Sequence, residues 1–175
     1  MASRRLETLA VAGLTACLLS VASLEKASAA VYHVLDLGEA AGASYANFLG
    51  QDSIADAPGG KAATIDKVSL DFANGGAATL DETHVVFDCK VKRFKVMAER
   101  VFQGIAADSP GADKTNSADW QSFAAGSPMD NFQTLACTGA AKQEVVAFER
   151  SSVWTAATTV SGALTKIHND ETGGK

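Results

Sequence analysis

The chain has 175 residues, a length typical of one domain, and its 47% hydrophobic and 20% charged residues are the composition of a globular protein. Its net charge is −5, which argues against a broad nucleic-acid-binding surface because such surfaces need clustered Lys and Arg. The one long apolar run lies at the N-terminus, so we expect no transmembrane segment in the mature chain.

The N-terminus has the three parts of a secretory signal peptide. Arg4 and Arg5 form a short basic region, a largely apolar stretch covers residues 9–24, and the small residues 27–30 suit the pocket of a signal peptidase. The apolar stretch has 16 residues, fewer than the roughly 20 that a membrane-spanning helix needs. We therefore expect residues 1–30 to be a signal peptide and the mature protein to be exported, to the periplasm or the cell surface.

A second cleavage site lies inside this segment. Residues 14–17 read Leu-Thr-Ala-Cys, which is the pattern of a bacterial lipobox, and Cys17 would then be lipidated and become the new N-terminus. The apolar run continues past Cys17, and the stretch before it is short and carries Glu7, so the soluble signal peptide is the preferred interpretation.

The mature chain is predicted to be rich in β-strands. Segments of alternating or β-forming residues predict strands over 31–37, 45–49, 63–72, 83–89, 91–102 and 120–124. In the third of these, Ile65 is expected on one face, with Val68 and Leu70 on the other. The fourth and fifth form either one long bent strand or a tight hairpin. Turns are expected at 58–60 and 74–76, and residues 104–118 are expected to form an exposed loop.

A helix is predicted to start at Ser127. Ser127 can cap it, Pro128 suits the first helical position, and Phe132 and Leu135 then fall on one face together with Ala136. The helix is expected either to run on or to restart after residue 139, because Ala141, Val145 and Phe148 keep a helical spacing. Residues 152–164 are ambiguous between strand and helix, and 168–175 are expected to be a disordered end.

Three cysteines occur, and Cys17 leaves with the signal peptide. Cys89 and Cys137 remain as an even pair in an oxidising compartment, which predicts one disulfide. Redox pairs usually have Cys-x-x-Cys spacing, and zinc needs more ligands than these two cysteines provide. The bridge would fasten the predicted helix to the strand that ends at Cys89.

We find no sequence pattern for catalysis or for a cofactor. His33, His84 and His168 are scattered, and no paired-histidine helix or nucleophile elbow occurs. We expect a non-enzymatic protein without a bound metal or cofactor.

Several short motifs together resemble a known family. In chain order they are Asp52-Ser53-Ile54, Phe87-Asp88-Cys89-Lys90, Arg93-Phe94-Lys95-Val96, Trp120, Gly126-Ser127-Pro128 and Cys137. This series resembles the surface-adhesin protein E-like domain of Gram-negative bacteria. The turn at 52–54 is tighter than in the family pattern, and the chain continues about 35 residues beyond Cys137, where the family domain usually stops.

The resemblance implies an α+β fold, a mainly antiparallel β-sheet with a C-terminal helix tied to the sheet by a disulfide. It implies Cys89 and Cys137 as the bridge and Trp120 as a core residue. The family domain would cover residues 31–140, leaving 141–175 as a partly disordered C-terminal extension. Founding members of the family bind host extracellular-matrix proteins, but no binding residue can be carried over, because a fold does not by itself transfer a function.

The expected function is therefore that of an exported envelope protein of the surface-adhesin E-like type, with a binding or structural role. The alternatives are a periplasmic structural or stress-related domain and a lipoprotein anchored at Cys17. A possible binding surface is a basic strand with Lys90, Lys92, Arg93 and Lys95, which would suit an acidic extracellular or envelope macromolecule. The more common role of such residues is solubilising charge on a half-exposed sheet, and the binding surface is the alternative hypothesis.

Overall fold

The computed structural model describes residues 29–40, 42–114, 119–141 and 146–173. The predicted signal peptide, apart from its last two residues, and the alternative lipidation site at Cys17 lie outside these ranges. None of the helices in the described part of the chain is long and apolar enough to cross a membrane.

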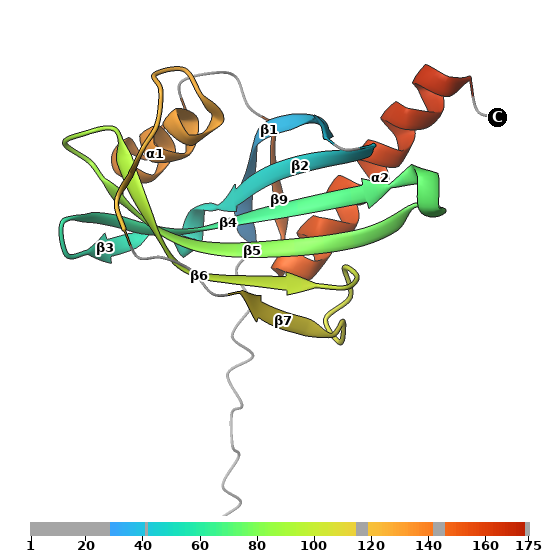
Figure 1. The fold of residues 1–175 in the computed structure, drawn as a ribbon, viewed down its shortest axis with the longest axis horizontal. Coiled ribbons are helices and arrows are strands. Elements are labelled where there is room, and N and C mark those ends of the chain that lie inside the picture. Colours follow the sequence, from blue (N-terminus) through green and yellow to red (C-terminus); the bar gives the residue numbers. More distant parts are fainter. Residues whose placement is uncertain (1–28, 41, 115–118, 142–145, 174–175) are drawn as a thin grey trace, which may run out of the picture.

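A single twisted antiparallel sheet forms the body of the molecule (Figure 1). Its main path runs β7-β6-β5-β4-β2-β1-β9, and two short strands pair beside it, β3 with β4 and β8 with β6. The strands are β1 (Ala30–Ala40), β2 (Ala43–Gly50), β3 (Ala55–Ala57), β4 (Gly60–Asp71), β5 (Ala77–Asp88), β6 (Arg93–Phe102), β7 (Gly111–Lys114), β8 (Gln121–Ser122) and β9 (Val146–Arg150). The helices are α1 (Pro128–Thr138) and α2 (Val153–Thr172), with short 3₁₀ turns η1 (Gln51–Ser53) and η2 (Phe72–Asn74).

The two helices cover opposite faces of the sheet, and each face has its own core. Along β4, Ile65 belongs to the cluster that packs on α1, whereas Val68 and Leu70 belong to the cluster that packs on α2. This confirms the predicted alternation, in which successive side chains of a strand point to opposite faces. Phe48 and Phe87 are fully buried in the α2 and α1 clusters respectively.

Two hairpins organise the long strands. Asn74, Gly75 and Gly76 turn the chain between β4 and β5, and both glycines have a φ of about +75°, which only glycine adopts without strain. The chain from 89 to 92 is a turn, so β5 and β6 form a tight hairpin and not one bent strand. Of the two arrangements left open by the sequence, the hairpin is the one that occurs.

Helix α1 begins where the sequence predicts, but its N-terminus is capped differently. The Ser127 hydroxyl donates to the carbonyl of Ala124 and does not cap the helix. Instead the backbone N–H of Gly126 donates to Asp130 Oδ2 at 2.7 Å, so a carboxylate in the first turn binds the chain that leads into the helix. Phe132 and Leu135 are buried, as predicted.

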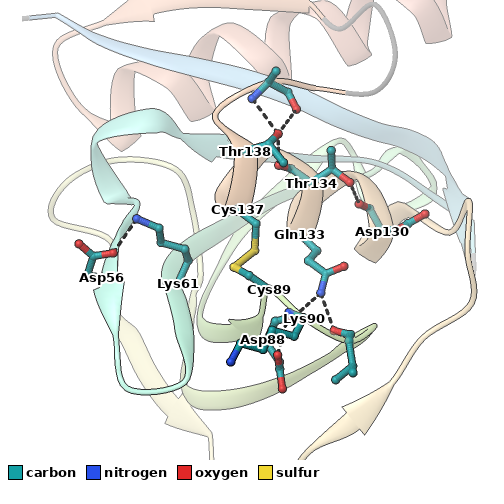
Figure 2. The surroundings of a disulfide bond; sticks show 12 residues. Asp56, Lys61, Asp88, Cys89, Lys90, Asp130, Gln133, Thr134, Cys137 and Thr138 are labelled. Carbon is teal, nitrogen blue, oxygen red and sulfur yellow. Dashed lines mark hydrogen bonds and ion pairs between the residues drawn. A yellow bond between two sulfur atoms is a disulfide. The ribbon is translucent and has the colours of Figure 1, made fainter.

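The predicted disulfide is present. Cys89 and Cys137 are joined by an S–S bond of 2.01 Å that links α1 to the end of β5 (Figure 2). The α+β fold class, a mainly antiparallel sheet with a disulfide-tied helix, is thus confirmed.

The C-terminal part of the chain differs from the prediction. Gly139 adopts a left-handed conformation and ends α1, and Phe148 lies in strand β9, so the expected continuing helix is wrong; Val145 lies outside the described residues. Strand β9 pairs with β1, placing Phe148 opposite Tyr32, and the two rings stack 5.9 Å apart. Pairing with β1 gives the backbone of residues 146–150 hydrogen-bonding partners in the extended conformation.

Helix α2 completes the fold. Ser152 and Thr155 form a reciprocal capping box at its start, and Val160 and Leu164 are buried on the sheet. The expected disordered end is wrong for residues 168–172, which are the last turns of α2. Residues 146–172, which the prediction places in a C-terminal extension, supply an edge strand and four of the buried residues of the core on the α2 face.

Two smaller predictions are also wrong. The loop expected over 104–118 contains strand β7, which pairs with β6 and is joined to it by a Lys114–Glu99 ion pair of 2.6 Å; residues 115–118 lie outside the described part. Trp120 is not a core residue, because 38% of it is exposed.

Candidate functional site

The four predicted basic residues do not form one strand face. Lys90 and Lys92 lie in the turn before β6, and only Arg93 and Lys95 lie on the strand. Lys92 makes an ion pair with Asp130, which is 2% exposed at the start of α1. This lysine therefore fastens the hairpin to the helix, and its charge is partly neutralised within the fold.

Arg93 is likewise held by a carboxylate. Its Nη2 and Nε donate to Asp88 Oδ2 at 2.8 and 3.0 Å, and the backbone N–H of Lys90 donates to Asp88 Oδ1 at 2.9 Å. The Lys90 backbone N–H and then the Arg93 guanidinium lower the pKa of Asp88 below its ordinary value. The turn is thereby kept in one conformation by an ionised carboxylate.

Arg93 and Lys95 meet at the ring of Trp120. The guanidinium carbon of Arg93 lies 4.7 Å, and Nζ of Lys95 5.3 Å, from the ring centroid. Strand β8 positions the ring, because Ser122 pairs with Arg93. We call Trp120, Arg93 and Lys95 the Trp120 surface. This surface combines a partly exposed aromatic ring with two cationic side chains, in a protein whose net charge is −5.

Figure 2 shows how the disulfide and the Gln133 side chain fasten α1 to the turn that precedes Arg93. The Gln133 side chain on α1 donates from Nε2 to the carbonyls of Asp88 and Val91, at 2.5 and 2.8 Å. Together with the Cys89–Cys137 bond, these hydrogen bonds fix the turn between β5 and β6 to the helix.

A hollow of about 310 Å³ with several polar lining residues opens on the face that carries α2. We call it the Asp66 pocket. Its walls come from β1, β2, η1, β4, β5 and the first residue of α2. The lining residues are Tyr32, Gly50, Asp52, Ser53, Thr64, Asp66, Glu82, His84 and Val153.

Strand register explains how these polar side chains come together. Asp66 of β4 is the cross-strand partner of Glu82 on β5, and Thr64 is the partner of His84. His84 lies 3.1 Å from the Thr64 hydroxyl through Nδ1, and 2.8 Å from Glu82 Oε1 through Nε2. The imidazole of His84 therefore links the cross-strand pair Thr64–His84 to the neighbouring pair Asp66–Glu82 by hydrogen bonds.

Asp66 is the unusual member of this group. It is 3% exposed, and its Oδ1 has no hydrogen-bond partner in the described part of the chain. Burial, and then the nearby Glu82, raise the pKa of Asp66 well above its ordinary value. Burial, followed by the charges of Asp52 and Asp66, raises the pKa of Tyr32 to about 12, so the phenol stays protonated near these carboxylates.

Sequence reasoning missed this pocket, although a signal was present. Asp66, Val68 and Leu70 are alternate residues of one strand, so their side chains point to the same face, and the sequence places a carboxyl group on an otherwise apolar strand face.

Among the described residues, no group of three or more His, Cys, Asp or Glu side chains could hold a metal ion.

No family model, curated protein or solved structure matches this chain. The resemblance to surface-adhesin protein E-like domains therefore stays a prediction that depends on its short motifs.

Proposed function

We propose that this chain is an exported bacterial envelope protein of the surface-adhesin E-like type, which acts by binding an acidic macromolecule and not by catalysis. The observation that carries the export proposal is the Cys89–Cys137 disulfide, because such bonds persist in oxidising compartments and are rare in the cytosol. The signal-peptide pattern over residues 1–30 supports the same location.

The start of the fold agrees with removal of a signal peptide. The first paired residue is Ala30, which lies opposite Arg150 at the end of β1. Cleavage after Ala29 leaves every β1 pair in place, and cleavage after Ala30 removes only this one pair.

The Trp120 surface is the binding surface in this proposal. Lys95 offers positive charge beside the partly exposed ring of Trp120, and Arg93, whose guanidinium is paired with Asp88, lies against the same ring. Tryptophan and arginine are among the residues that most often dominate binding energies at interfaces. The turn below is fixed by the disulfide and by Gln133, so little conformational entropy is lost on binding.

Export is tested by expressing the full chain in a Gram-negative host and measuring the intact mass of the envelope-derived protein, with and without reductant. The expected mass begins at Ala30 or Val31 and is two hydrogens lighter without reductant. A cytosolic, unprocessed protein with free thiols would contradict export. A diacylated species beginning at Cys17 would show that the protein is a lipoprotein.

Surface binding is tested with heparin as the acidic probe, measuring the salt concentration that elutes the mature protein from a heparin column. The Lys95→Glu variant should elute earlier than wild type. Lys166→Glu is the matched control, because it makes the same charge change at an exposed α2 position paired with Asp170. Equal elution of the two variants would contradict a role for the Trp120 surface.

Protease treatment of intact cells separates the proposal from its alternative. Digestion of the folded protein on intact cells supports a surface adhesin, whereas protection until the outer membrane is opened supports a periplasmic structural or stress-related domain.

A further inference from the structure

The Asp66 pocket holds a carboxyl group whose surroundings are incomplete. Buried polar groups in folded proteins are nearly always hydrogen-bonded, and each exception needs a physical explanation. Asp66 is 3% exposed, lines the pocket, and has no partner for Oδ1 among the described residues. A ligand that donates hydrogen bonds to this carboxyl group would supply the missing partner.

The charge of the lining selects the kind of ligand. Asp52, Asp66 and Glu82 are carboxyl groups, and none of the nine lining residues is Lys or Arg. His84 already binds Thr64 and Glu82, and the first turn of α2 carries no charged side chain. A cation with several N–H donors would therefore meet three carboxyl groups in this hollow and no Lys or Arg side chain that would repel it.

The shape of the pocket limits the size of the ligand. Gly50 forms part of its wall, and a Cβ at this position would lie 3.1 Å from both the Tyr32 ring and Asp52 Oδ1. The open hollow of about 310 Å³ has room for an ammonium group with a short alkyl chain.

Two other chemistries fit less well. Thr64, His84 and Glu82 line up as a nucleophile, a base and an acid would, but the lining offers no Lys or Arg to stabilise the oxyanion of acyl transfer. A divalent metal needs a cluster of ligating side chains, and the described residues provide no such group.

We propose that the Asp66 pocket binds a primary ammonium group, with Asp66 and Glu82 accepting its hydrogen bonds and the Tyr32 ring forming one wall. The ammonium group can belong to a free alkyl diamine or to a lysine side chain of a peptide, since the chemistry is the same. The pocket draws on none of the residues of the Trp120 surface, so this inference is independent of the proposed function.

The test is isothermal titration calorimetry of the mature, disulfide-bonded protein with 1,4-diaminobutane, N-acetyl-lysine methylamide and 1,4-butanediol as probes. We expect one or both amines to bind at one site per chain, and the uncharged diol not to bind. The stronger amine identifies the source, a free diamine or a peptide lysine. Failure of both amines to bind would overturn the proposal.

Variants locate the site. Asp66→Asn and Glu82→Gln should each weaken amine binding at least tenfold, and Gly50→Ala should weaken it by reducing the space while keeping every charge. Asp108→Asn, at an exposed loop position, is the matched control for loss of one negative charge and should bind like wild type. Circular dichroism checks that each variant is folded. Because there are three pocket variants, the test can still be made if one of them does not fold. Equal weakening by Asp108→Asn, or none by the pocket variants, would overturn the assignment.

Discussion

Removing the disulfide should cost this domain a large part of its stability. The Cys89–Cys137 bond closes a loop with a sequence separation of 48 residues. For that length the chain-entropy model gives about 4 kcal/mol, against a total of about 5–15 kcal/mol for a typical domain. The Cys89→Ala/Cys137→Ala variant should therefore unfold at a urea concentration lower by about 2 M, if the urea dependence is about 2 kcal/mol per molar.

The measurement is urea denaturation followed by circular dichroism, on the mature protein with and without reductant. Reductant should move the wild-type curve onto that of the double variant and leave the variant unchanged. The hydrogen bonds from Gln133 and the Lys92–Asp130 ion pair remain in the variant, so it should still fold in the absence of urea. A loss below about 1 kcal/mol would refute the loop-closure reasoning.

Further predictions concern a carboxyl group and two glycines. The raised pKa of Asp66 means that the folded state keeps this proton where the unfolded chain has lost it, so wild-type stability should fall as pH rises from about 4, by up to about 1.4 kcal/mol per pH unit. Urea curves of Asp66→Asn between pH 4 and 8 should lack this dependence, and a parallel pH profile in the two proteins would contradict it. Gly60→Ala places a Cβ 1.7 Å from the carbonyl oxygen of Phe87 and should lower the melting temperature, at a cost of about 1–3 kcal/mol. Gly162→Ala, in open space on α2, should stabilise the protein by about 0.5–1 kcal/mol and so raise its melting temperature. A Gly60→Ala variant that melts at or above the wild-type temperature would contradict the steric argument at Gly60.

The local sequence pattern was sufficient to predict an element where one face of that element is apolar and turn residues follow its last residue. Strand β4 shows this, since its alternation and the following Asn74-Gly75-Gly76 turn were both readable. The start of α1 was readable from Pro128, and the disulfide from the even number of cysteines that remain once Cys17 is assigned to the predicted signal peptide. The strand, the turn and the helix start depend on residues close in sequence, and the disulfide depends on the number of cysteines.

Elements that depend on a distant partner could not be predicted. Strand β7, with the sequence Gly-Ala-Asp-Lys, lacks strong β-formers and is held by pairing with β6. Phe148 fits a helical period as well as a strand period, and the unpaired edge of β1 decides between them. The Asp66 pocket arises from the register between β4 and β5, which places Asp66 beside Glu82, and no short motif encodes that register.

Strand β9 also sets the order in which the domain can be completed. It is the outer partner of β1, so the first strand of the fold pairs with the last one (Figure 1). A chain delivered from its N-terminus through a membrane presents β1 first and must wait for residues 146–150 before that edge is covered. If the chain is exported as proposed, the pairing of β1 with β9 can form only after residues 146–150 have crossed the membrane. A chain cut after residue 145 would arrive with β1 as an open edge, ready to pair with another molecule.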